Sequence, residues 1–248
     1  MKAFGRRAAA CLFLLILGVP RRGAAQAVAD SGRLASVLRG VPLRTGNWKF
    51  AQTLIRAAGD SQSLGTRTVA VSASVLAGNP VWMISEERRG TVVETADTVT
   101  LLQSDLSPQH WAARIGSAQV GVAFTGDSAF GAMETYRGRS SFTAAISPGI
   151  ILSAAMLESL VEALPLQGGY HVAASLMTIG DVPKVMAVDI AVDGEDMVLA
   201  GPGSVAAWRV LVRTDETMLR LWISKSDHRV VKKDESIRGD HLVSTVLP

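Results

Sequence analysis

The sequence predicts a mainly β protein (α+β), with a large curved antiparallel sheet or half-barrel wrapped around one central apolar helix at about residues 148–164. Three observations predict this fold. From Trp48 onward, apolar and polar residues alternate with the period of two that is typical of strands with one buried face. Turn residues separate these runs at short intervals, as in an antiparallel meander. One segment, between Ser147 and Pro165, changes to helical spacing.

The first 27 residues have the pattern of a cleavable export signal. A basic start precedes an apolar run over 8–19, and Ala25-Gln26-Ala27 forms a small-x-small cleavage site. The apolar run is shorter than the roughly 20 residues that a bilayer-spanning helix needs. We therefore expect a periplasmic or secreted protein that begins at Val28 and is not integral to the membrane after cleavage.

Removal of this signal changes the charge balance. The full chain has 25 Lys plus Arg and 22 Asp plus Glu; residues 1–27 hold five basic residues and no acidic one, which leaves 20 against 22, a net charge of −2. Such a chain lacks the basic character of a nucleic-acid-binding protein. The single cysteine, Cys11, lies in the signal, so no disulfide is expected in the exported chain. Because no linker divides the remainder, we expect a leader segment at 28–46 and a single β domain at 47–248.

The elements before the helix follow from alternation and turn residues. A short helix over Leu34–Leu38 is expected in the leader. The predicted strands are Trp48–Arg56, Thr68–Val75, Val81–Glu87, Val92–Gln103, His110–Ile115, Val120–Phe124 and Met133–Tyr136.

In the helical segment, Ser147 is the predicted N-cap, Pro148 lies in the first turn and Pro165 ends the helix. Its apolar residues cover an arc of roughly 200°, and Glu158, Ser159 and Glu162 occupy the remaining side. An apolar arc of that width predicts a helix cradled by a curved sheet rather than one lying on a flat surface.

After the helix the strands resume. Alternation over Met186–Val192 ends at Asp193-Gly194, which predicts a tight hairpin turn. The later predicted strands are Ser204–Arg213, Met218–Lys225, Arg229–Ser236 and His241–Leu247. Short connections predict a meander of consecutive neighbours.

The sequence contains no local catalytic or metal-binding motif. Its four histidines are scattered without metal-ligand spacing, and it has no G-x-S-x-G nucleophile elbow. We therefore expect no metal, no cofactor and no enzyme activity. A Ser-His-Asp site can form from distant residues, so a hydrolase with a dispersed site remains an alternative.

Tryptophan and methionine are spread over separate predicted strands and the helix. Such side chains suit an apolar groove for acyl chains, although they also fill ordinary cores. The predicted groove residues are Trp82, Trp111, Met156, Leu160, Trp208 and Trp222.

The C-terminal meander carries Ala207-Trp208-Arg209-Val210, Leu221-Trp222-Ile223-Ser224 and Arg229-Val230-Val231-Lys232-Lys233. With the export signal and the central helix, this pattern resembles uncharacterised bacterial periplasmic families grouped near the lipoprotein-carrier (LolA/LolB-like) fold, over most of Trp48–Leu247. The resemblance implies an open half-barrel with helical cover and a groove for lipid or acyl chains. It transfers no functional residue.

The first functional hypothesis is thus a noncatalytic periplasmic protein that binds or carries a lipid-like or acylated ligand. The second is a noncatalytic cell-envelope scaffold that binds another envelope protein through an exposed sheet edge. Neither hypothesis involves nucleic acid.

Overall fold

The computed structural model describes residues 34–90, 94–146, 150–179, 183–215, 217–237 and 239–248. Over these residues the chain is mainly β, as predicted, with one open, mostly antiparallel sheet of 15 strands and two short helices. The first helix covers 34–38, where the leader helix was predicted. No helix in the described part is long and apolar enough to cross a membrane. The predicted export signal lies outside the described residues.

The elements follow one another along the chain with short connections. They are β1 (Gly46–Ile55), β2 (Ser61–Leu76), β3 (Asn79–Arg89), β4 (Thr95–Leu102), β5 (Pro108–Ile115), β6 (Ala118–Thr125), β7 (Ser128–Thr135), β8 (Gly138–Ala145), β9 (Ile150–Ile151), α2 (Ala154–Glu162), β10 (His171–Ile179), β11 (Pro183–Ala200), β12 (Gly203–Arg213), β13 (Met218–Ser224), β14 (Val230–Ile237) and β15 (Asp240–Val246).

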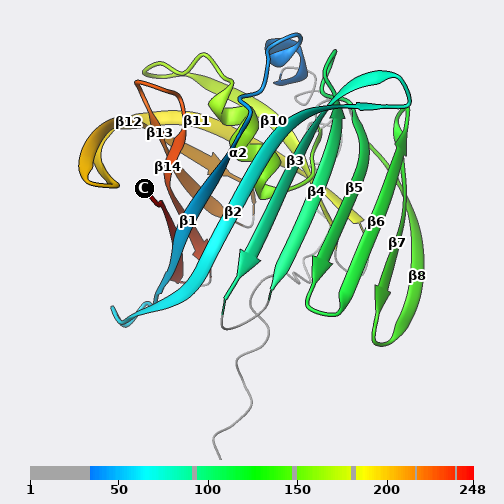
Figure 1. Cartoon of the computed structure of the whole chain (residues 1–248), viewed down its shortest axis with the longest axis horizontal. Coiled ribbons are helices and arrows are strands. Elements are labelled where there is room, and N and C mark those ends of the chain that lie inside the picture. The colour runs from blue at the N-terminus through cyan, green and yellow to red at the C-terminus, as the bar shows by residue number, and fades with distance from the viewer. Residues whose placement is uncertain (1–33, 91–93, 147–149, 180–182, 216, 238) are drawn as a thin grey trace, which may run out of the picture.

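The strand order is β8-β7-β6-β5-β4-β3-β2-β1-β15-β14-β13-β12-β11-β10-β9. Each half is therefore a meander of sequence neighbours, which confirms the topology predicted for the C-terminal half. The two halves join where β1 pairs antiparallel with β15, from Phe50 opposite Val246 to Ile55 opposite His241. Figure 1 shows β1–β8 as one layer in front of the strands of the second half.

Three strands were not predicted: β8, β10 and the two-residue β9, which lies within the predicted helix. The sequence of β8, GRSSFTAA, consists mostly of small and polar residues. Its burial alternates only weakly because it lies at the end of the sheet. Hydrophobic alternation identifies strands with one face in a core, so it gives a poor signal for an edge strand of this kind.

The central helix begins later than predicted. Ser153, not Ser147, is the N-cap residue, and its hydroxyl accepts a hydrogen bond from the Met156 N–H at 3.1 Å. The preceding Ile150 and Ile151 form strand β9, which pairs in parallel with β10. β-Branched residues favour such an extended conformation.

The predicted hairpin turn at Asp193-Gly194 is wrong. Strand β11 runs through this dipeptide, with a register shift between Val192 and Gly194, and the turn follows Ala200. A Cβ at Gly194 would lie 2.6 Å from a guanidinium nitrogen of Arg209, which also donates a hydrogen bond to the Asp193 carboxylate. The glycine therefore permits the close approach of an arginine across a bulge, rather than a chain reversal.

The main core lies between the two halves of the sheet and includes α2. Leu34, Leu38 and Leu43, which precede β1, pack into the same core. A second, small cluster of Val198, Ala207, Trp222 and Val231 lies on the other face of the C-terminal strands.

Substitution of Gly65 tests the close contact between β2 and the end of β3. A Cβ at this residue would lie 2.1 Å from the backbone oxygen of Arg89, and its φ is +101°. Gly78 has a similar φ of +83°, but a Cβ there would have no atom within 4 Å. We expect Gly78→Ala to lower the free energy of unfolding by about 1 kcal/mol from backbone strain alone, and Gly65→Ala by at least about 3 kcal/mol. Urea denaturation measures both; equal losses would contradict the close contact.

Candidate ligand-binding site

Five of the six predicted groove residues come together in the interior. Trp82, Trp111, Met156 and Leu160 belong to the main core and are at most 7% exposed, and Trp208 packs against the same core. The indole N–H groups of Trp82 and Trp111 have no hydrogen-bond acceptor among the described residues. These side chains share one hydrophobic core with α2.

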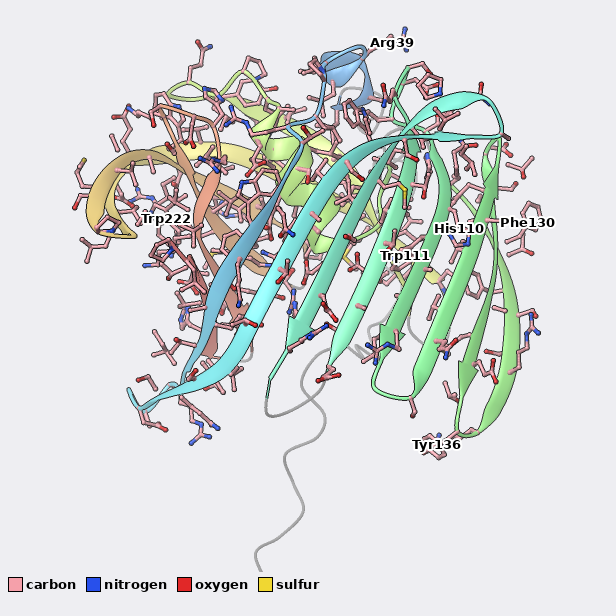
Figure 2. The ribbon with its side chains drawn as sticks, in the orientation of Figure 1. Arg39, His110, Trp111, Phe130, Tyr136 and Trp222 are labelled. Carbon is pink, nitrogen blue, oxygen red and sulfur yellow. The ribbon has the colours of Figure 1, made fainter. Side chains whose placement is uncertain are left out.

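Trp222 is separate from the other five. It lies opposite Arg209 of β12, whereas Trp208 directly precedes Arg209 and therefore faces the opposite side of the sheet. The Trp222 indole donates a 2.7 Å hydrogen bond to Asp196, and Lys232 lies 4.6 Å from its ring centroid. Figure 2 shows Trp111 and Trp222 on separate halves of the sheet. A ligand-binding role for the six residues stays a prediction.

Glu158 of α2 connects the helix to both halves of the sheet. Its carboxylate accepts a 2.8 Å hydrogen bond from Arg67 of β2 and lies 3.3 Å from the ammonium of Lys233 of β14. Arg67 also donates a 2.7 Å hydrogen bond to Glu86 of β3. All four side chains are at most 4% exposed. A polar residue that the helical pattern set apart from the apolar arc is thus buried and ion-paired through both carboxylate oxygens, although its Oε1 accepts no hydrogen bond from the described residues.

Two further ion pairs extend this buried charge network, which we define as Arg67, Glu86, Arg88, Glu158, Lys233 and Glu235. Arg88 binds Glu86, and Lys233 lies 3.5 Å from Glu235. Burial alone would raise the pKa of Glu86, but the charges of Arg67 and Arg88 outweigh it and hold that pKa well below its usual range. The network contains three cations and three anions, so its charges balance; Arg88 and Glu235, at its margin, are partly exposed.

Polar contacts also fix both ends of α2. At the start, Asp97 of β4 lies beside the cap residue Ser153; burial, reinforced by the charge of Glu86, raises the pKa of Asp97 to about 7 despite the hydrogen bond from Ser153. At the end, the Glu162 carboxylate accepts a 2.7 Å hydrogen bond from the backbone N–H of Val230. The helix is therefore held at its start, middle and end.

A pocket of about 510 Å³ lies at the end of α2. We call it the α2 pocket. Three elements contribute to it: the segment before β1, the last turn of α2 and the connection from β13 to β14. Its lining residues are Pro42, Leu43, Arg44, Thr45, Glu162, Ala163 and His228.

The backbone of His228 is held in a conformation that side-chain-bearing residues rarely adopt, with φ +53°. Its N–H donates a 2.9 Å hydrogen bond to Ser224 O, which closes the turn. Such strain of a non-glycine residue is found in tight turns and often at binding or catalytic sites. Here it directs a histidine to the wall of a pocket.

The charges around the α2 pocket are only partly compensated. Burial raises the pKa of Glu162 to about 7, against the lowering effect of the Val230 N–H; Glu158 raises it further, and Arg44 and Arg229 lower it. Arg229 pairs with Asp227. Arg44 is exposed and has no ion-pair partner within 4 Å among the described residues. The pocket thus offers a cation that forms no ion pair within 4 Å among the described residues, and a carboxyl group that is poorly solvated when ionised.

The described residues contain two histidine–aspartate pairs, His171 with Asp189 and His241 with Asp234. Within the same residues, no group of three His, Cys, Asp or Glu side chains could hold a metal ion.

Sequence reasoning missed the α2 pocket because its residues come from three separate segments. Arg44 lies in the predicted leader and His228 between two predicted strands. The sequence signal for the pocket was the pair Glu158 and Glu162, one turn apart on an otherwise apolar helix. A carboxylate on a helix enclosed by a sheet must find a cation or a donor, and both do so.

Removal of Arg67 tests the buried charge network. Arg67→Met leaves Glu86 and Glu158 without their shared cation, so we expect the free energy of unfolding to fall by about 3–5 kcal/mol. Arg56→Met is the control, because Arg56 and Asp60 form an exposed ion pair whose loss costs about 0–1 kcal/mol. Urea denaturation measures both variants; a loss for Arg67→Met no larger than that of the control would contradict the role of Glu158 as an anchor.

Titration of Glu162 makes stability depend on pH. Its folded pKa of about 7 lies above the ordinary value of 4.5, so the folded state binds more protons between these values and stability falls as pH rises through that window. Glu162→Gln cannot ionise and keeps an oxygen for the Val230 N–H. Between pH 5 and pH 8, we expect the free energy of unfolding of Glu162→Gln to fall by about 2 kcal/mol less than that of the wild type.

Urea denaturation at both pH values measures this difference. Asp97 acts in the same direction, so Asp97→Asn is measured beside it. The exposed Glu134→Gln, on β7, is the control for the loss of one charge. An identical pH dependence of the wild type and Glu162→Gln would show that Glu162 is ionised throughout.

Comparisons with protein-family models, with curated proteins and with solved structures found no match to this chain. The family and the function named by the resemblance to lipoprotein carriers therefore stay predictions.

Proposed function

We propose that this chain is a noncatalytic binding protein of the cell envelope that holds a lipid-like, amphipathic ligand in the α2 pocket. The observation that carries the proposal is the mixed lining of this pocket at the end of a helix whose other sides are buried. One part of the wall is apolar and another part carries charge, which matches a molecule with a polar head and a hydrocarbon chain.

The size of the pocket sets how much of the ligand it holds. It is largely open to solvent, with a volume of about 510 Å³, which falls in the range of roughly 300–1,000 Å³ that is usual for small-molecule sites. Pro42, Leu43 and Ala163 supply apolar surface, where burial of hydrocarbon contributes about 25 cal/mol per Å². We infer that the pocket takes the head and the adjoining methylene groups, while the rest of the chain remains outside it.

The charged side chains of the α2 pocket determine which polar head group the ligand would carry. Arg44 has no ion-pair partner among the described residues and would bind a phosphate or carboxylate. Glu162 would be ionised more readily if a ligand supplied a hydrogen-bond donor or an ammonium group, because burial is what raises its pKa. The favoured ligand is therefore zwitterionic, with an anionic group next to an amine, as in an aminophospholipid.

This site lies at the end of α2 and not between α2 and the sheet, where the sequence predicted a groove. A ligand between them would displace Glu158 from Arg67 and Lys233, and breaking such a buried pair costs several kcal/mol. Exchange through the α2 pocket leaves those ion pairs in place. The proposal therefore keeps the ligand class of the first sequence hypothesis and changes its location.

Calorimetric titration with a short-chain phosphatidylethanolamine, below its micellar concentration, tests the proposal. We expect saturable binding at one site, and recovery of the unchanged lipid by mass spectrometry. Thr45→Trp would fill the pocket from an exposed wall residue and weaken binding at least about tenfold. Thr125→Trp, at an exposed residue next to the β6–β7 turn, is the matched control and should bind like the wild type.

A fatty acid of equal chain length, which lacks the amine, is the comparison ligand and should bind more weakly. Absence of binding by both lipids, or equal binding by wild type and Thr45→Trp, would overturn the proposal. Hydrolysis of the lipid during incubation would instead favour the hydrolase alternative.

A further inference from the structure

Strand β8 ends the sheet with an unpaired edge. It pairs with β7 on one side, and no strand of the described chain pairs with its other side. The opposite end of the sheet is different, because β9 covers the middle of β10 at Ser175 and Leu176. Figure 1 shows β8 at the outer margin of the front layer, and Figure 2 shows Phe130 and Tyr136 of the adjoining hairpin there.

The register of the β7–β8 hairpin fixes which backbone groups face outward. Thr135 and Gly138 form its closing pair, and Ile146 donates a 2.7 Å hydrogen bond to Asp127 O at the far end. The even-numbered residues of β8 therefore bond to β7, and the alternate residues direct their N–H and C=O groups to the free edge. These outward residues, all exposed, are Arg139, Ser141, Thr143 and Ala145.

β8 has few of the features that protect an edge strand, although some of its residues lie near β11. Proteins usually shield edge strands with proline, lysine, a bulge or an inward charge. β8 contains neither proline nor lysine, and its register with β7 has no shift. The Phe142 ring lies over Gly131 of β7, within 2.2 Å of where a Cβ of that glycine would be, so it points back from the edge and leaves the backbone uncovered.

We propose that β8 pairs antiparallel with β8 of a second copy of this chain, about a two-fold axis that passes between the two Phe142 residues. This register places Arg139 opposite Ala145 of the second copy and Ser141 opposite its Thr143. Symmetry repeats both pairs, so every outward residue of both strands is paired and each pair exchanges two hydrogen bonds. No other register of the two strands uses all the outward groups.

The charges favour a copy of the same strand as the occupant. Arg139 is the only charged residue of β8, so the two arginines lie at opposite ends of the shared ladder and do not repel each other. Within each copy, Arg139 lies opposite Glu134 of β7, so this register brings no two like charges of the two copies together.

Sedimentation equilibrium of the full chain tests this pairing. A short ladder buries a small area, so we expect a dimer that forms at about 10–100 µM rather than an obligate one. Ser141→Pro removes an outward N–H that β7 does not use and should raise the dimer dissociation constant at least tenfold. Ser141→Ala keeps the N–H and should dimerise like the wild type.

Cross-linking tests the register independently of affinity. In a chain with Cys11→Ala, Phe142→Cys would place two thiols opposite each other across the axis, at a separation that permits a disulfide. Ala144→Cys, opposite Ser140 of the second copy, would not bring its two copies together. We expect an oxidised dimer for the first variant and a monomer for the second.

Three results would overturn the inference: a monomer throughout the concentration range, a dimer that Ser141→Pro leaves intact, or cross-linking of Ala144→Cys in preference to Phe142→Cys. If a different protein is recovered bound to the β8 edge, and Ser141→Pro abolishes that binding, then that protein and not a second copy is the partner of β8, as the scaffold hypothesis states. None of these results bears on lipid binding, because the α2 pocket contains no residue of β8.

Discussion

The carboxylate of Glu158 is the contact on which the arrangement of the molecule depends. It is the point where one helix binds both meanders, through Arg67 on β2 and Lys233 on β14. Desolvation of these groups is costly, so the ion pairs add little net stability over a well-packed apolar core. Their effect is on specificity: any other rotation or depth of α2 would leave a buried charge without its partner.

The position of the α2 pocket follows from this anchor. Because Glu158 fixes the rotation of the helix, Glu162, one turn later, must lie on the same side, where it meets the backbone of Val230. The turn that carries His228 lies just before Val230, and the segment with Arg44 passes the end of the helix. The charge balance of the network and the composition of the pocket are thus consequences of one helix orientation.

Most strands could be predicted from the sequence because alternation reports a strand with one face in a core. That reasoning could not detect β8, because its inner face is only partly buried. It also could not detect the bulge at Gly194, where the absence of a Cβ lets Arg209 approach the backbone. It also combined Trp222 with Trp208, although the two lie on different faces. The α2 pocket lay beyond sequence reasoning because Arg44, Glu162 and His228 meet only after the two meanders have joined around the helix.

The pairing of the first strand with the last has a consequence for how the chain reaches this structure. Each meander consists of contacts between near neighbours, whereas the buried hydrogen bond from Gln52 to Ser244 spans 192 residues. The chain entropy lost in closing a loop of that length costs about 4–5 kcal/mol of free energy before any contact offsets it. Local hairpins can therefore form early, while the seam between β1 and β15 is the slow, late event in assembly. In a circular permutant, with the ends of this chain linked and a new break at an exposed turn, β1 and β15 would be close in sequence. Such a permutant should fold faster to the same sheet.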